Sequence, residues 1–213
     1  MTGSSVPPFA VISGAQVQQA LAGRERQITE LVEATYRVHG AGDSVNPPSY
    51  FLRFLDRPTS RIIALPASIG GKLRVDGLKW ISSFPENVAA GIPRASAVLI
   101  LNDHDTGYPF ACLESSIISA TRTAASAALA ADWLTRGRPR PARVGFFGTG
   151  LIARYIHTFL TGTGWSFDEI GVHDLSAEHA AGFRGYLEKA GPGRITVYED
   201  AEQLIRSSDL VVF

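Results

Sequence analysis

Residues 143–153 read Arg143-Val-Gly-Phe-Phe-Gly-Thr-Gly-Leu-Ile-Ala153, and this stretch decides the fold. Residues 144–147 are a β-branched and aromatic run that predicts a buried strand. Gly148-Thr149-Gly150 predicts a sharp turn, and the apolar residues of 151–160 recur at helical spacing. Strand, glycine turn and helix in this order are the context that a dinucleotide-binding fingerprint requires.

The glycines and the residues around them are expected to hold a dinucleotide. Gly148 permits the tight turn, Gly150 lets the backbone approach a pyrophosphate, and the small Ala153 lets the helix pack closely on the strand. The helix N-terminus offers unpaired N–H groups and a partial positive charge to the phosphates. A second apolar strand at 170–173 ends in Asp174, close to the spacing of about 20 residues at which a carboxylate holds the ribose 2′-hydroxyl. No arginine adjoins Asp174, so the sequence favours NAD over NADP, whose 2′-phosphate would be repelled.

From residue 143 onward, the pattern predicts the alternating strands and helices of a Rossmann-type α/β domain. Helices are expected at 151–160 and 176–190, a third strand at 195–198, and a fourth at Leu210-Val-Val-Phe213. A terminal apolar strand would leave an unpaired edge, and doubly wound folds usually contain two βαβαβ halves. We therefore expect the NAD-binding domain to be truncated after its fourth strand, and the chain to be the front part of a longer protein.

The first part of the chain is expected to form an α+β domain. Ser13 is a suitable helix N-cap, and helical patterning continues to about His39. Apolar or alternating runs predict strands within residues 50–101, and Asn102-Asp-His-Asp-Thr-Gly107 predicts a hairpin turn. An Ala-rich stretch at 114–136 predicts a long helix.

The connector Arg138-Pro-Arg-Pro141 is stiff, and we place the domain boundary there. The predicted domains are residues 1–137, for substrate binding and dimerisation, and residues 142–213, a partial Rossmann NAD-binding domain.

The composition is that of an ordinary globular chain, with 213 residues, 45% hydrophobic and 19% charged. Lys+Arg and Asp+Glu are both 20, which gives no indication of nucleic acid or of an anionic membrane as a partner. The single Cys112 excludes an internal disulfide and suits a reducing compartment. The N-terminus lacks the pattern of a secretory signal, and no apolar run could span a bilayer. We therefore expect a cytoplasmic protein.

Three basic residues, Arg53, Lys79 and Arg122, stand inside apolar elements. A charge there is costly unless it is paired or faces an anionic ligand. For each residue alone, a solvated face or a structural ion pair is the favoured interpretation. Beside a dinucleotide site, phosphates and substrate carboxylates become the expected partners.

Two other features are interpreted without a catalytic role. Asp103-His104-Asp105 lacks the further His or Cys of a zinc site, so a solvated turn is favoured and no metal is expected. Cys112 has no basic partner close in sequence and is interpreted as a small buried hydrophobe, not a nucleophile.

Five motifs follow one another along the chain: Gly77-Leu-Lys-Trp-Ile-Ser-Ser-Phe-Pro-Glu-Asn87, Arg94-Ala-Ser-Ala-Val-Leu-Ile-Leu-Asn-Asp103, Thr106-Gly-Tyr-Pro109, Ser119-Ala-Thr-Arg-Thr-Ala-Ala125 and Gly148-Thr-Gly150. In this order they resemble the ornithine cyclodeaminase/mu-crystallin superfamily. The first three look most like the N-(2-amino-2-carboxyethyl)-L-glutamate dehydrogenases, which make 2,3-diaminopropionate for siderophores and peptide antibiotics.

The resemblance implies a two-domain enzyme that forms a homodimer through a β-sheet of its substrate domain, completed in the family by a C-terminal segment. Arg53 and Lys79 match residues that bind the substrate carboxylate, and Arg122 matches one that lies against the cofactor. The family's acidic catalytic residue lies beyond Phe213, so the proton-transfer residue is unknown for this chain. The other residues implied to bind NAD are Gly148, Thr149, Gly150, Leu151, Ile152 and Asp174.

Two departures argue against a cyclodeaminase, which often has Gln in place of Ile152 and Thr in place of Arg94. Arg94 is therefore expected to bind an extra carboxylate that ornithine lacks. The reaction implied is the NAD-dependent oxidative cleavage of N-(2-amino-2-carboxyethyl)-L-glutamate to 2-oxoglutarate and L-2,3-diaminopropionate. Three alternatives stay open: conversion of ornithine to proline plus ammonia, a non-catalytic mu-crystallin-like binding protein, and an inert fragment.

Overall fold

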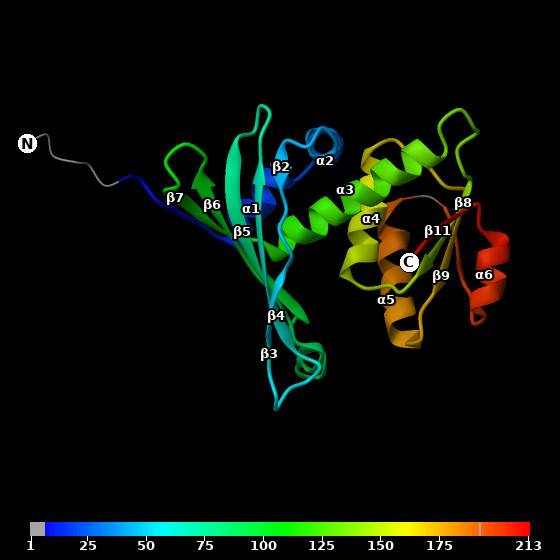
Figure 1. Cartoon of the computed structure of the whole chain (residues 1–213). Coiled ribbons are helices and arrows are strands. Elements are labelled where there is room, and N and C mark those ends of the chain that lie inside the picture. Colours follow the sequence, from blue (N-terminus) through cyan, green and yellow to red (C-terminus); the bar gives the residue numbers. More distant parts are fainter. Residues whose placement is uncertain (1–6, 192) are drawn as a thin grey trace, which may run out of the picture. The chain divides into compact units, whose positions relative to one another are not determined.

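The computed structural model describes residues 7–191 and 193–213, which form two compact units (Figure 1). No helix in these two ranges is long and apolar enough to cross a membrane. The domain boundary expected at residues 138–141 was a statement about segments that fold independently. It stays a prediction. Unit 1 is Met1–Ala22 with Glu33–Ser119, and unit 2 is Gly23–Val32 with Ala120–Phe213.

Unit 2 contains the predicted Rossmann-type sheet, four parallel strands in the order β10-β9-β8-β11. The strand order reverses at β8, and the crevice at such a switch point is where doubly wound sheets bind ligands. The α/β fold class is thereby confirmed, the fourth strand included. The strands are β8 (Arg143–Phe147), β9 (Glu169–His173), β10 (Arg194–Val197) and β11 (Leu210–Val212).

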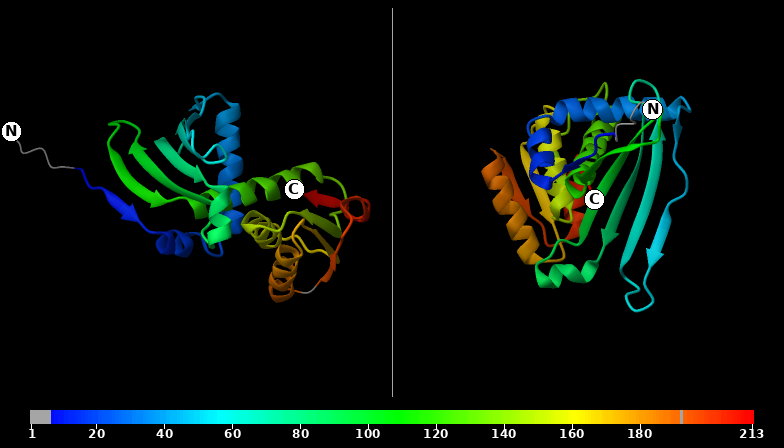
Figure 2. Two further views of the ribbon diagram at one scale, coloured as in Figure 1. Left: turned by 90° about the horizontal axis from the view of Figure 1, so that it is seen from below. Right: turned by 90° about the vertical axis from the view of Figure 1, so that its left-hand side faces the viewer.

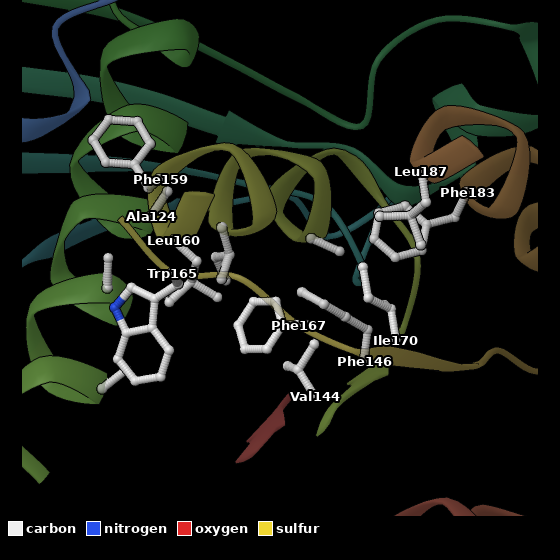
Figure 3. Packing of buried hydrophobic residues seen from close by; sticks show 14 of the residues in the cluster. Ala124, Val144, Phe146, Phe159, Leu160, Trp165, Phe167, Ile170, Phe183 and Leu187 are labelled. Atoms are coloured by element: carbon white, nitrogen blue, oxygen red, sulfur yellow. The ribbon is translucent and has the colours of Figure 1, made fainter. Parts of the chain in front are cut away.

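One face of this sheet carries the apolar core of unit 2. Phe146 of β8 meets Phe183 of α5 (Ala177–Ala190) edge to face, with ring centroids 5.3 Å apart. Helix α4 (Leu151–Gly162) and the unit 2 part of α3 (Ser116–Leu134) add further side chains to the same cluster, as Figure 3 shows. Burying each such large side chain stabilises the fold by about 1.5–3 kcal/mol.

On the opposite face of the sheet, two neighbouring strands present glycines, so no side chain projects at these positions. Gly145 of β8 pairs with Gly171 of β9, and Leu204 of α6 (Ala201–Ser207) lies on both. A Cβ built on either glycine would fall well inside contact distance of the Leu204 side chain, which is 0% exposed. The glycines therefore let α6 pack directly on the sheet backbone.

Unit 1 is built on a seven-stranded sheet in the order β1-β7-β6-β5-β4-β2, with β3 also paired to β4. The long strands β4, β5 and β6 run antiparallel side by side (Figure 2). The predicted β6–β7 hairpin is confirmed. The strands are β1 (Ala10–Ile12), β2 (Ser44–Val45), β3 (Tyr50–Arg53), β4 (Arg61–Ile69), β5 (Val75–Ser83), β6 (Ala95–Asp103) and β7 (Pro109–Glu114).

The helix expected from Ser13 to His39 is instead two helices, α1 (Gly14–Leu21) and α2 (Glu25–Gly40). Ser13 is the predicted N-cap of α1. The break contains Gly23, whose φ of 71° is left-handed and cannot continue a helix. A short 3₁₀ helix, η1 (Pro85–Ala90), lies between β5 and β6.

Replacing Gly171 with alanine is expected to destabilise the protein by about 1–3 kcal/mol, because the new Cβ would overlap the fully buried Leu204 side chain. Gly185 of α5 is the matched control, since a Cβ there meets nothing within 4 Å. Gly185→Ala should raise stability slightly through helix propensity. Urea unfolding of the two variants measures both effects, and equal midpoints would contradict the packing argument.

Candidate functional site

The predicted glycine turn joins the end of β8 to the start of α4. Gly148 has φ of 78°, in the left-handed region that a side chain disfavours. Its N–H donates to the carbonyl of His173, 3.0 Å away, at the end of β9. The turn therefore needs glycine at 148 for its own backbone conformation.

Gly150 has a different reason to be glycine. Its φ of −70° and ψ of −172° are open to any residue, and a Cβ there would meet no heavy atom within 4 Å. Neither backbone conformation nor packing within the described residues requires glycine here. An outside group that approaches this backbone closely would require it, and a pyrophosphate fits that requirement.

The N-terminus of α4 lacks a side-chain cap of the kind that begins α1, α5 and α6. Gly150 is its N-cap and provides no side-chain hydrogen bond, whereas Ser13, Ser176 and Asp200 cap α1, α5 and α6. The first intrahelical bond of α4 runs from Arg154 N–H to Gly150 O, at 3.5 Å. In the described ranges, three N–H groups therefore stay available to an anion at the positive end of the helix dipole. They belong to Leu151, Ile152 and Ala153.

Asp174 fastens the end of β9 to this turn. Its Oδ2 accepts from the Thr149 N–H at 2.8 Å and from the Thr149 hydroxyl at 2.7 Å. Its Oδ1 accepts from the Ser176 N–H at 2.9 Å. A carboxylate offers about four acceptor positions, so a position remains for a ribose hydroxyl. The sequence predicted a ligand-binding role for Asp174 and missed its bond to Thr149, which is 3% exposed.

The carboxyl of Asp174 is held in its ionised form. Burial acts to raise its pKa, but hydrogen bonds from Ser176 and Thr149, with a smaller contribution from His179, lower the pKa below its usual value. The group is therefore negative at neutral pH. A negative charge here disfavours a ligand with a 2′-phosphate.

Apolar side chains surround the turn on the outside. Leu151 is 62% exposed, Ile152 is also exposed, and Leu175, directly after Asp174, is 100% exposed. These side chains offer apolar surface to the rings of a bound dinucleotide. Leu175 was not found from the sequence, although its place after the strand-end acid could have indicated it.

Arg122 lies in unit 2, on the exposed side of α3. Within residues 7–191 and 193–213, no carboxylate forms an ion pair with its guanidinium. The sequence interpretation favoured a solvated face or a structural ion pair for Arg122 alone, with an anionic ligand as the alternative. Its exposed position fits a solvated face and also leaves the guanidinium accessible to an anion, so the cofactor-binding role stays a prediction.

The basic residues of unit 1 are divided between two places on the sheet. Arg53 pairs with Arg61 of β4, and Arg61 pairs in turn with Ser83 of β5. Lys79 lies four residues before Ser83 on the same strand. Arg53 and Lys79 therefore point to the same face of the sheet. Four residues of strand correspond to about 13 Å. Arg94 directly precedes Ala95, the partner of Ser83, so it lies at the Arg53 end and not beside Lys79.

Lys79 is half-buried, and its Nζ donates to the Ser119 hydroxyl of α3 at 3.2 Å. Both residues belong to unit 1, so this bond ties the β5 side chain to the first turn of α3 within that unit. An ammonium group is a compact cation with three donors, which is the chemistry that a substrate carboxylate requires.

The hairpin residues Asp103-His104-Asp105 have structural partners. Asp103 accepts from the N–H and the hydroxyl of Thr106, which closes the turn. His104 Nδ1 lies 3.2 Å from Asp76 Oδ1. Both contacts match the interpretation of this segment as a turn.

A protein-family model described as "Ornithine cyclodeaminase/mu-crystallin family" matches residues 11–213. The chain is 30% identical over 212 residues to the N-((2S)-2-amino-2-carboxyethyl)-L-glutamate dehydrogenase of Staphylococcus aureus, a match that covers 94% of this chain and 61% of that protein. The chain thus spans about three fifths of that relative's length.

Two solved structures have the same fold. An archaeal alanine dehydrogenase dimer with bound NAD matches with a TM-score of 0.80 and 27% identity, over 92% of this chain and 57% of that chain. The Δ1-pyrroline-2-carboxylate reductase of Thermococcus litoralis, in complex with NADH and L-proline, matches with a TM-score of 0.85 and 23% identity. That match covers 95% of this chain and 61% of the reductase.

The two glycines of the turn are expected to respond differently to alanine. Gly148→Ala should cost about 1–2 kcal/mol, because it forces a side chain into the left-handed region. Gly150→Ala should change stability by less than about 0.5 kcal/mol, because its backbone accepts alanine and its Cβ meets no atom. Thermal and urea unfolding measure the difference, and an equal loss in both variants would contradict it.

Proposed function

Because the chain belongs to the ornithine cyclodeaminase/mu-crystallin family, we propose that it is the NAD-binding and substrate-binding part of an amino-acid dehydrogenase. The observation that carries the proposal is the uncapped N-terminus of α4 beside Gly150, with the ionised Asp174 at the next strand end. Phosphates fit the free N–H groups, and a ribose hydroxyl fits Asp174. The bound cofactors of the structural relatives support the same assignment.

The substrate we propose is N-(2-amino-2-carboxyethyl)-L-glutamate. NAD supplies the acceptor for a hydride from the glutamate α-carbon, which leaves a C=N bond in the substrate. Water adds to this imine, and the C–N bond then breaks to give 2-oxoglutarate and L-2,3-diaminopropionate. The 30% identity to the Staphylococcus aureus dehydrogenase supports this choice, as do the Lys79 and Arg94 motifs.

The basic residues of unit 1 are assigned to substrate binding. Lys79, held by Ser119, binds the carboxylate at the reacting carbon. Arg53 and Arg94, which lie at the other end of the strands, bind carboxylates farther along the substrate. Holding three carboxylates at separate points fixes the substrate for hydride transfer. Arg122 is assigned to the cofactor, with Gly148, Thr149, Gly150, Leu151, Ile152 and Asp174.

We further propose that the protein acts in the cytoplasm as a homodimer and supplies 2,3-diaminopropionate for a siderophore or a peptide antibiotic. The printed description of the archaeal alanine dehydrogenase as a dimer supports the assembly. A cyclodeaminase, which forms proline and ammonia from ornithine, is the second candidate because of the family's own description.

Incubation of the full-length protein with NAD and the glutamate–diaminopropionate adduct tests the main proposal. We expect NADH, seen by its near-ultraviolet absorbance, together with 2-oxoglutarate. Gly150→Ala should abolish both products without unfolding the protein, since its Cβ would enter the pyrophosphate position. Proline and ammonia from ornithine without net NADH would favour the cyclodeaminase, and no product with either substrate would exclude both.

Arg94→Ala is expected to raise KM for the adduct about 10-fold or more, with a smaller change in kcat. The reason is the loss of a charge-assisted hydrogen bond, which is typically worth about 1.5–3 kcal/mol. Arg94→Lys, which keeps the charge, should recover part of the loss. Steady-state kinetics measure both variants, and an unchanged KM in Arg94→Ala would refute this role.

A further inference from the structure

Arg61 lies directly opposite Arg53 in the antiparallel pairing of β4 with β3. Directly opposite residues point to the same face, with Cβ atoms about 4.5–5.5 Å apart, and like charges in such a pair destabilise the sheet. Arg53 is exposed and Arg61 is half-buried. Within the described ranges, no carboxylate forms an ion pair with either guanidinium, so this pair has no protein counter-ion there.

The neighbouring arginine has a different environment. Arg57 Nε lies 3.3 Å from Asp56 Oδ2, and its guanidinium lies 4.2 Å from the ring centroid of Phe54. The segment between β3 and β4 therefore provides partners for its own arginine. The Arg53 guanidinium also has an aromatic contact, 5.0 Å from the ring centroid of Phe51, but unlike Arg57 it has no carboxylate partner within the described ranges. An external anion could supply the counter-charge of the Arg53–Arg61 pair.

The pair shares its sheet face with Lys79. Arg61 pairs with Ser83, four residues after Lys79, so the three cations point to the same side. Between the two ends, Ile63 pairs with Ile81 on this face. The face thus carries two arginines at one end, an apolar step, and a lysine whose Cα lies about 13 Å farther along the strands.

We propose that Arg61 is a specificity-determining residue, which acts with Arg53 to bind a carboxylate at the far end of the substrate. This inference rests on the proposed function and adds Arg61 to the site. Two guanidinium groups can hold one carboxylate through several charge-assisted hydrogen bonds. A substrate with a single carboxylate, held by Lys79, would leave the pair without an anion. Arg61 therefore selects amino acids that carry carboxylates at both ends.

Calorimetric binding of two acids to the NADH-loaded full chain tests the role. The probes are 2-oxoglutarate, with two carboxylates, and pyruvate, with one, in buffer free of ammonium. Arg61→Met should raise Kd for 2-oxoglutarate about 10-fold or more and leave Kd for pyruvate within about twofold. Arg61→Lys should recover part of the affinity. Arg57→Met, the matched control, should change neither value.

Unfolding and kinetics complete the test. Because Arg61→Met relieves repulsion with Arg53, its thermal midpoint should equal or exceed that of the unchanged protein. It should also raise KM for the adduct with little change in kcat. A lower midpoint, or equal weakening of both acids, would mean a structural role and overturn the proposal.

The proposal and the proposed function can fail separately. Selective 2-oxoglutarate binding that depends on Arg61, without cleavage of the adduct, would reject the reaction and retain the role of Arg61. Cleavage of the adduct with an unchanged KM in Arg61→Met would support the proposed reaction and reject the role of Arg61. Failure of the unchanged protein to bind 2-oxoglutarate would also overturn the Arg61 proposal.

Discussion

The Asp174 carboxylate is the contact on which the candidate cofactor site depends. It receives the N–H and hydroxyl of Thr149 and the N–H of Ser176, so it joins the end of β9 to the turn before α4. The bond from Gly148 N–H to His173 O supports the same junction. These bonds fix where α4 begins, and therefore where its free N–H groups point. They also keep Asp174 ionised, so one side chain both builds the site and gives it charge.

Glycine serves three different physical purposes in unit 2. Gly145 and Gly171 remove side chains so that Leu204 can pack on the sheet. Gly148 allows a left-handed turn. Gly150 satisfies neither need, and its open surroundings indicate space for a ligand. The sequence shows the same residue at all four positions, and only the local backbone and packing separate the three structural glycines from Gly150, which neither requires.

In unit 1, the strand register decides which basic residues lie near one another. Arg53 and Lys79 could be selected from the sequence because each charge interrupts an apolar run. Arg61 is the first residue of β4, and a basic residue at the start of a strand does not interrupt an apolar run. Its pairing with Arg53 depends on the register at which the consecutive strands β3 and β4 align. Arg94 was predicted to bind an extra carboxylate without a position on the sheet, and the same ladder places it at the Arg53 end.

The sequence by itself determined the Rossmann order of elements, the glycine turn, the strand-end Asp174 and the β6–β7 hairpin. These follow from local signals: hydrophobic periodicity, turn residues and short spacings. It failed at Gly23, where one predicted helix is two, because a single glycine in a helical pattern does not reveal its φ. Only the tertiary structure decided that Asp174 bonds to Thr149, that α4 lacks a side-chain cap, and that Arg61 lies opposite Arg53. Those contacts join residues from separate elements, and their geometry is set by packing and register, which no local pattern records.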